Sequence, residues 1–319
     1  MKKLIALLIT LALVFSLAAC AGSSTMMTMG TGGTAGTYYG YGGILGNQIK
    51  TDTGITINVV STDGSKANIL GIDVGNYQLG TVQSDVMAYA WEGSRSFEKE
   101  GKIESFRVIG GLYAEAVQLV TMNPEIKSVA DLRGKKVSIG AAGSGVYFNA
   151  VDILAAAGMT EKDIVPQYQS FADSADALKD GKIDAAFIVA GAPTPAIQEL
   201  CTSASAYLVP IDGDIAKKLM EGDSSFYTEY KIPANTYKGQ TSDVITVTVK
   251  ATLIVSASAK EDDVYNITKA IFDNIDVITA SHAKGAELSL ENATSGMAAP
   301  FHAGAAKYFK EKGITVESK

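Results

Sequence analysis

The sequence predicts a two-lobed α/β fold, in which two mixed sheets are flanked by helices and a hinged cleft separates the lobes. Strand-like and helix-like segments alternate along most of the chain, which is typical of α/β proteins with largely parallel sheets. Two long β runs, near 117–122 and 245–256, are spaced to connect two lobes twice. A glycine-rich turn occurs in each half of the chain, and interfaces between lobes are favoured ligand sites.

The expected elements follow from runs of apolar residues bounded by glycine, serine and aspartate. The predicted strands cover 55–62, 77–83, 106–122 (as two strands), 135–140, 183–191 and 243–257. The predicted helices cover 65–75, 84–93, 128–134, 144–158, 174–181, 194–203, 261–278 and 303–313. Ser128 is a favoured N-cap residue, and Gly158 suits the position after a helix end. Lobe one is expected from 26–120 plus 250–319, and lobe two from 121–249.

The first twenty residues have the layout of a secretory signal peptide. Lys2 and Lys3 precede an apolar run, and the small-residue segment Leu17-Ala18-Ala19-Cys20 follows it. The run is shorter than the about 20 apolar residues of a transmembrane helix. Leu-Ala-Ala-Cys also resembles the bacterial lipobox, which implies removal of residues 1–19, lipidation of Cys20 and a linker over 20–25. An ordinary signal peptide with a chance cysteine is the alternative.

Composition narrows the function classes. The formal charge is −7, and loss of Lys2 and Lys3 with residues 1–19 makes it −9. Without a basic tract, nucleic acid is not an expected partner. Cys201 has no second cysteine for an intramolecular disulfide after Cys20 is lipidated, and is expected to be a small buried hydrophobe. The body of the protein is therefore expected to be soluble, outside the cytoplasm, and held at the membrane by its lipid.

Two segments, "MTMGTGGTAGTYYGYGGIL" and "VSIGAAGSGVYFNAVDIL", form a quasi-repeat. Each has a strand, spaced glycines, a small hydroxyl residue, a tyrosine and an apolar helix. Each would place a helix N-terminus, with its free N–H groups and partial positive charge, at the carboxyl end of a strand. One such loop from each lobe predicts a clamp for an anion. The alternative is that glycine and serine only form tight turns and N-caps.

The first of these loops also matches G-x-G-x-x-G/A through Gly30, Gly32 and Ala35. A nucleotide loop is rejected nevertheless. No lysine follows as in a Walker A motif, and Asp52 precedes the next strand instead of ending it. The export signal also places the loop where nucleotides are scarce.

Catalytic signals are sparse. His282 and His302 have no metal-ligand spacing, Cys201 has no evident base, and paired acids stand at helix starts, where they commonly act as caps. No enzyme activity, metal or cofactor is expected.

The ordered motifs resemble the TAXI family, the TRAP-associated extracytoplasmic solute-binding proteins. The resemblance covers most of the chain after the signal peptide. Its motifs, in chain order, are "GTGGTAGTYY", "STDGSKAN", "VQSDVMAYAWEG", "VADLRGKKVSIGAAGSG", "NAVDILAAAG", "IPANTYKGQ" and "PFHAGAAKYFKEKG".

This resemblance implies a periplasmic-binding-protein-like fold that closes on a small organic anion such as glutamate, 2-oxoglutarate or a similar carboxylate. The ligand would pass to a TRAP-type permease that is driven by an ion gradient and that, in this family, commonly has its small and large subunits fused. The ligand-binding residues carried over are Gly33, Thr34, Tyr38, Ser61, Gln83, Ser84, Asp85, Ser144, Gly145, Val146, Asn149, Gly191 and Pro193.

Their expected roles follow from their chemistry. N–H groups and hydroxyls at Thr34, Ser144 and Gly145 would hold carboxylate oxygens, and Tyr38 would cover the apolar part of the ligand. Asp85, where it faces the cleft, would accept from a ligand ammonium or hydroxyl. None of the three arginines falls in these loops, so carboxylate binding is expected to rely on helix termini and hydroxyls.

Two alternatives to a TRAP-type partner stay open at this stage. The runner-up is the binding lipoprotein of an ATP-driven importer, since the architecture is shared. The chain also suits an extracytoplasmic sensor that presents its ligand-bound form to a membrane kinase.

Overall fold

A computed structural model describes residues 25–221 and 226–319; the predicted signal peptide and Cys20 lie outside them. The predicted α/β fold is confirmed. The strands are β1 Met26–Gly30, β2 Thr56–Val60, β3 Leu79–Gln83, β4 Phe106–Thr121, β5 Lys136–Ser138, β6 Val165–Gln167, β7 Ala185–Ala190, β8 Tyr207–Val209, β9 Thr228–Ile232 and β10 Val244–Ser256. The α-helices are α2 Thr37–Thr53, α3 Ser65–Asp73, α4 Ser84–Glu92, α5 Val146–Ala156, α6 Phe171–Lys179, α7 Pro195–Ser203, α8 Gly213–Met220, α9 Glu261–Phe272, α10 Ile275–Ser281, α11 Leu290–Thr294 and α12 Ala303–Glu311.

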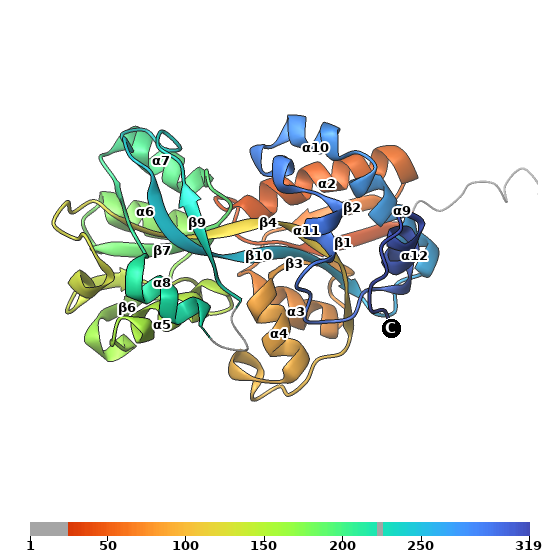
Figure 1. Ribbon diagram of the computed structural model, residues 1–319, viewed down its shortest axis with the longest axis horizontal. Helices are drawn as coiled ribbons and strands as arrows, with labels where there is room; N and C mark the ends of the chain where they lie inside the picture. The colour runs from red at the N-terminus through yellow and green to blue at the C-terminus, as the bar shows by residue number, and fades with distance from the viewer. Residues whose placement is uncertain (1–24, 222–225) are drawn as a thin grey trace, which may run out of the picture.

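These elements gather in two lobes joined by β4 and β10 (Figure 1). Lobe one contains β1–β3, α2–α4 and the C-terminal helices α9–α12, and lobe two contains β5–β9 and α5–α8. The boundaries at 120/121 and 249/250 stay a prediction, because β4 and β10 run through both lobes.

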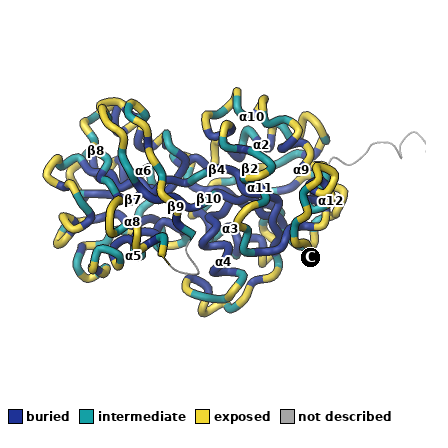
Figure 2. The backbone as a smooth tube through the Cα atoms, in the orientation of Figure 1, coloured by how far each residue is buried: buried dark blue, intermediate teal, exposed yellow. Residues whose placement is uncertain are grey.

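The strands form one hydrogen-bonded path instead of two separate sheets. Its order is β2-β1-β3-β10-β4-β7-β5-β6, with β8 on β4 and β9 on β10. β1, β2 and β3 are parallel in lobe one, and β5, β6 and β7 are parallel in lobe two. The antiparallel pair β4–β10 joins the two parallel sets, and both strands are buried along most of their length (Figure 2).

At the lobe junction, β10 changes its pairing partner from a strand of lobe two to a strand of lobe one, and β4 begins to pair with lobe two. β10 pairs with β9 up to Thr248 and with β3 from Ala251. β4 pairs with β7 from Ala116 onward. The β4–β10 register shifts between Lys250 and Thr252, and such irregularities bend and twist a strand pair locally.

Several elements differ from the sequence-based expectation. Residues 106–122, predicted as two strands, form the single strand β4, because Gly110 and Gly111 continue the strand where Phe272, Ala293 and Asn292 pack against their backbone. The helix predicted over 261–278 is broken into α9 and α10 at Asp273–Asn274. The helix predicted at 128–134 is a short 3₁₀ turn over Val129–Leu132, and Ser128 and Asp131 form its capping box. β6, β8, β9, α8 and α11 were not predicted.

Leu253 lies at the centre of the lobe-one core, on β10 between β3 and β4, and is fully buried. Leu253→Ala should lower the free energy of unfolding by about 2–5 kcal/mol, because it removes buried methyl groups and leaves a cavity. Urea denaturation measures this change. Val277→Ala on α10 is the control, since Val277 is 52% exposed. Equal destabilisation by both substitutions would contradict the assigned core.

Candidate functional site

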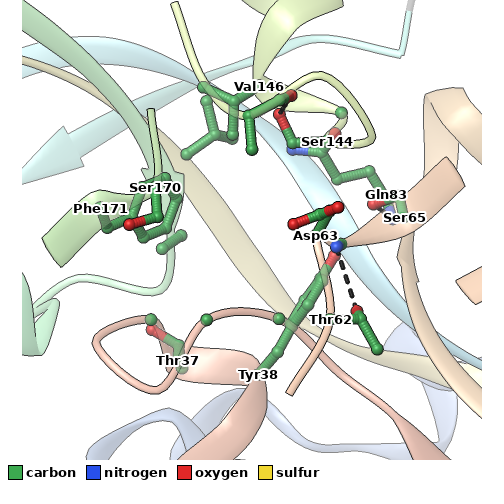
Figure 3. Close-up of a pocket in the computed structure, with 18 of the residues that line it drawn as sticks. Thr37, Tyr38, Thr62, Asp63, Ser65, Gln83, Ser144, Val146, Ser170 and Phe171 are labelled. Carbon is green, nitrogen blue, oxygen red and sulfur yellow. Dashed lines mark hydrogen bonds between the residues drawn. The ribbon is translucent and has the colours of Figure 1, made fainter. Parts of the chain in front are cut away.

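A cavity of about 80 Å³ lies where loops of the two lobes meet (Figure 3). Several waters or one small organic molecule fit in such a space. Lobe one contributes Tyr38 and Asp63, and lobe two contributes Ser144, Val146 and Phe171 across from them. The full lining is Gly32, Gly33, Gly36, Thr37, Tyr38, Thr62, Asp63, Gly64, Ser65, Gln83, Glu115, Ala141, Ser144, Gly145, Val146, Gln169, Ser170, Phe171, Val189 and Ala190.

Four helices begin at this cavity, namely α2 and α3 from lobe one and α5 and α6 from lobe two. The N-caps of α2 and α5 are Gly36 and Gly145, and neither helix start is capped by a side chain. Helix N-termini carry free N–H groups and a partial positive charge, so both lobes present groups that can bind an anionic atom.

Six residues of the predicted ligand set line the cavity: Gly33, Tyr38, Gln83, Ser144, Gly145 and Val146. Five of them converge because each copy of the quasi-repeat ends a strand and opens a helix at the lobe junction, and Gln83 joins them from the end of β3. Gly145 has a packing reason to be glycine. A Cβ at this position would stand 1.5 Å from Oε1 of Gln83, which belongs to the other lobe.

The other seven predicted residues do not line it. Thr34 and Ser61 are exposed on the rims of their loops. Ser84 faces a separate groove, where its Oγ accepts from the backbone N–H of Lys250. The Gly191 carbonyl accepts a hydrogen bond from the Thr37 hydroxyl, so Gly191 lies behind the Thr37 side chain. Pro193 lies two residues further on, after the cis peptide bond Ala192–Pro193. Asp85 and Asn149 are buried beneath the wall that Gln83 forms.

Sequence reasoning missed Glu115, Gln169, Ser170 and Phe171 as lining residues. Glu115 left a signal, because it is the only acid in the apolar run "GLYAEAVQLV". The segment at 169–171 gave none, since it precedes a helix with an ordinary serine cap.

Glu115 and Tyr38 form a buried polar pair in the cavity wall. The Tyr38 hydroxyl donates to Oε1 of Glu115, and the Glu115 side chain is almost fully buried. Burial raises the pKa of the Glu115 carboxyl well above its usual range, although the Tyr38 hydrogen bond acts in the opposite direction. Burial also raises the Tyr38 pKa, and the neighbouring Glu115 charge adds to this effect.

Buried hydrogen bonds cross from lobe to lobe beside the cavity. Nε2 of Gln83 in lobe one donates to Oδ1 of Asn149 in lobe two at 3.0 Å. Nδ2 of Asn149 donates to Oδ2 of Asp85 in lobe one at 2.9 Å and to the Tyr227 hydroxyl at 2.9 Å. We call Gln83, Asp85 and Asn149 the inter-lobe latch. Asn149 uses both ends of its amide across the junction, so the latch exists only when the lobes are together.

An ion pair extends this contact to the surface. Arg95 of lobe one binds Asp152 of lobe two, with Nη2 2.5 Å from Oδ1, and the Tyr227 hydroxyl donates to Oδ2 of Asp152 at 3.0 Å. The pair is partly exposed, so we assign it a smaller share of the closing energy than the buried latch.

Asp85 is the charged member of the latch. Burial raises the pKa of its carboxyl from 3.8 to about 6, and Oδ1 has no hydrogen-bond partner among the described residues. Because the folded pKa lies above the ordinary value, the ionised carboxyl destabilises the folded chain above pH 6. That cost fades as the pH falls from 6 toward 3.8.

Asp85→Asn keeps an acceptor for Asn149 and removes the charge. At pH 7.5 the variant should unfold with a free energy about 1–3 kcal/mol larger than the wild type, because a shift of one pKa unit corresponds to about 1.4 kcal/mol. At pH 4 the difference should fall below about 1 kcal/mol. Urea denaturation of both proteins between pH 4 and 8 measures this. A variant that is less stable at pH 7.5, or a difference that does not change with pH, would contradict the assignment.

Across 25–221 and 226–319, no group of three or more His, Cys, Asp or Glu side chains is placed to hold a metal ion. Within the same ranges, no helix has the length and apolar character to span a membrane.

Residues 29–313 match the NMT1-like family. The chain belongs to this family. Solved structures with a similar fold include the alkanesulfonate-binding protein SsuA from Xanthomonas axonopodis pv. citri, bound to MOPS. It is 16% identical, with a TM-score of 0.51 and 92% of each chain covered.

Two more solved structures share the fold. A putative L-cystine ABC transporter protein from Listeria monocytogenes is 18% identical, with a TM-score of 0.52, and the match covers 83% of this chain and 98% of that one. The ligand-binding component of an ABC-type import system from Staphylococcus aureus, with zinc bound, is 9% identical. Its TM-score is 0.52, with 92% of this chain and 94% of that chain covered. At these identities the likeness establishes the two-lobed fold.

Proposed function

We propose that this NMT1-like protein is the extracytoplasmic solute-binding component of a membrane importer. The cavity between the lobes, closed by the inter-lobe latch, carries the proposal. A small solute enclosed there would contact both lobes at once. The names of the similar structures, which are binding proteins and import components, support the same function.

Binding proceeds by closure of one lobe on the other. β4 and β10 are the described strands shared by both lobes, so bending at their junction opens the cavity. Closure brings Gly145 against Gln83 and forms the latch. The closed form is the state that the membrane partner recognises, because ligand shifts the lobe equilibrium only through contacts that the open form lacks.

The class of importer has two candidates. The similar structures include components of ABC-type importers, which favours an ATP-driven partner. The ordered motifs resembling the TAXI family favour an ion-gradient-driven TRAP permease, and six residues carried over from those motifs line the cavity. The described structure supports the ligand-binding step that both share.

A carboxylate group on the solute fits the uncapped starts of α2 and α5. A lipid on Cys20 would anchor the protein to the membrane. The predicted signal peptide supports a location outside the cytoplasm. The bound solute is released unchanged.

Thermal denaturation in the presence of amino acids, amines, carboxylates, sulfonates and sugars tests the binding function. At 100 times its dissociation constant, a ligand should stabilise the protein by about 2.7 kcal/mol and raise Tm by several degrees. Gly145→Leu should abolish this shift, because its side chain would displace Gln83 and hold the lobes apart. Gly40→Leu, on the exposed face of α2 with open space around it, is the matched control and should retain the shift.

The binding proposal fails when no compound of any class raises Tm, or when a bound compound is recovered chemically changed. Equal ligand response in Gly145→Leu and Gly40→Leu would remove the cavity as the site.

Uptake of the identified solute by cells that carry this protein distinguishes the importers. Depletion of ATP at a maintained ion gradient should stop transport by an ATP-driven partner, whereas an ionophore should stop a TRAP permease. Unchanged uptake after deletion of the protein, together with altered activity of a membrane kinase, would indicate the sensor function instead.

A further inference from the structure

Most hydroxyl groups in the cavity wall use their proton in a hydrogen bond to another oxygen of the protein. Of the six hydroxyl side chains in the lining, five donate to protein oxygens, and each therefore faces a ligand only as an acceptor. The donors, with their acceptors in parentheses, are Thr37 (Gly191 O), Tyr38 (Glu115 Oε1), Thr62 (Thr31 O), Ser144 (Ala141 O) and Ser170 (Asp173 Oδ2).

The latch fixes Gln83 as an acceptor too. An ionised Asp85 only accepts, so Asn149 directs its Nδ2 to Asp85 and its Oδ1 to Gln83. Gln83 must then donate through Nε2. Its Oε1 lies buried in the cavity wall against Gly145, with no hydrogen-bond partner among the described residues. A buried acceptor without a partner destabilises the closed protein, and a donor on the ligand would remove that cost.

Two more lining oxygens lack donors. Among the described residues, Oε1 of Gln169 is buried without a hydrogen-bond partner, and no hydrogen bond reaches Oε2 of Glu115. We call Glu115 Oε2, Gln83 Oε1 and Gln169 Oε1 the acceptor set. Both lobes contribute to it, because Gln83 belongs to lobe one and Gln169 to lobe two.

The charged residues around the cavity also favour a ligand group that donates hydrogen bonds. The lining contains Asp63 and Glu115 and no arginine or lysine. Lys284 approaches Gly191 from behind, but its Nζ is 2.5 Å from Oε1 of Glu287 and outside the lining. A hollow that shares Asp63 and Gln169 with the cavity is also lined by Asp173, Asp176 and Asp180. Asp176 pairs with Lys179 and Asp180 with Lys182, so Asp63 and Asp173 are the acids there without a lysine partner among the described residues.

We propose that the ligand carries a protonated amino or guanidino group, and that this group binds the acceptor set with Glu115 as its counter-ion. The inference rests on the proposed binding function and names the solute class. Ammonium and guanidinium groups are cations with three to five N–H donors, which matches an acceptor set that contains one carboxylate. The acidic hollow attracts such a cation toward the cavity. A carboxylate on the same molecule would use the N–H groups at the helix starts.

Binding of a cation also moves a proton. In the empty closed cavity, burial keeps the Glu115 carboxyl protonated more strongly than in water, and Asp85 adds to this effect. Tyr38, Tyr113, Asp63 and Lys284 are the other titratable groups near it. A ligand cation favours the ionised carboxylate, so ligand binding lowers the Glu115 pKa and releases any proton that the carboxyl holds in the empty cavity.

Calorimetric titration with matched pairs tests the proposal. Each pair differs in its amino groups: L-glutamate and 2-oxoglutarate, L-alanine and pyruvate, 1,4-diaminobutane and 1,4-butanediol. At least one amine should bind, and its partner should bind at least tenfold more weakly. In buffers of different ionisation enthalpy, binding at pH 7 should release up to one proton.

Glu115→Gln keeps the size of the side chain and removes its charge. It should weaken amine binding at least tenfold and abolish the proton release. Glu229→Gln, an exposed position on β9, is the matched control and should change the affinity less than twofold. An unchanged urea midpoint, or a higher one, shows that the Glu115 variant is folded.

Tight binding of an oxo acid or diol, or unchanged affinity in Glu115→Gln, would overturn this inference and leave the binding function intact. Failure of every compound class in the thermal screen would overturn the binding function itself.

Discussion

The antiparallel pairing of β4 with β10 is the interaction on which the other features depend. These two strands are hydrogen-bonded to each other across the lobe junction. β10 also pairs with β3 of lobe one and β9 of lobe two, and β4 also pairs with β7 and β8 of lobe two. Because these two strands hold the lobes in a fixed register, the carboxyl ends of the parallel strands in both lobes face the junction. The loops that follow those strands, and the helices that begin there, consequently meet at one cavity. Glu115 stands on β4 opposite Val249 of β10, one residue before the pairing with β7 begins, so the acid in the wall belongs to the connection itself.

Hydrogen-bond direction determines what this cavity can bind. Helix starts from both lobes supply backbone N–H groups, while the side chains supply acceptors because their own protons are used elsewhere. Asp85 governs part of this arrangement without lining the cavity. Its charge orients Asn149, and Asn149 orients Gln83. The latch that holds the lobes together thereby also sets the chemistry of one wall.

The sequence predicted the alternation of strands and helices, and it predicted the lining loops before α2 and α5, because both signals are local. Strand periodicity identifies β10, and a glycine-serine turn before an apolar run identifies the start of α5. The paired turns at Gly33 and Gly145 could be found for the same reason. The single continuous sheet could not be predicted, because pairing partners are set by long-range register.

The sequence also could not predict which side chains face the cavity. Motif order placed Asp85 and Asn149 near the ligand, but their burial behind Gln83 depends on contact between the lobes. Phe171 and Gln169 reach the cavity from an ordinary helix start, which carries no sequence signature of its own. Thr34 belongs to the correct loop and points to solvent, because a loop motif does not specify which of its residues faces inward.

Lobe closure around a solute is the central claim, and small-angle X-ray scattering measures it directly. The radius of gyration should be compared for the purified protein alone and with the compound that raises its Tm most. The account predicts a smaller radius on addition of that compound, and no such decrease in Gly145→Leu. A radius that stays constant while the compound binds would contradict closure of the two lobes about β4 and β10.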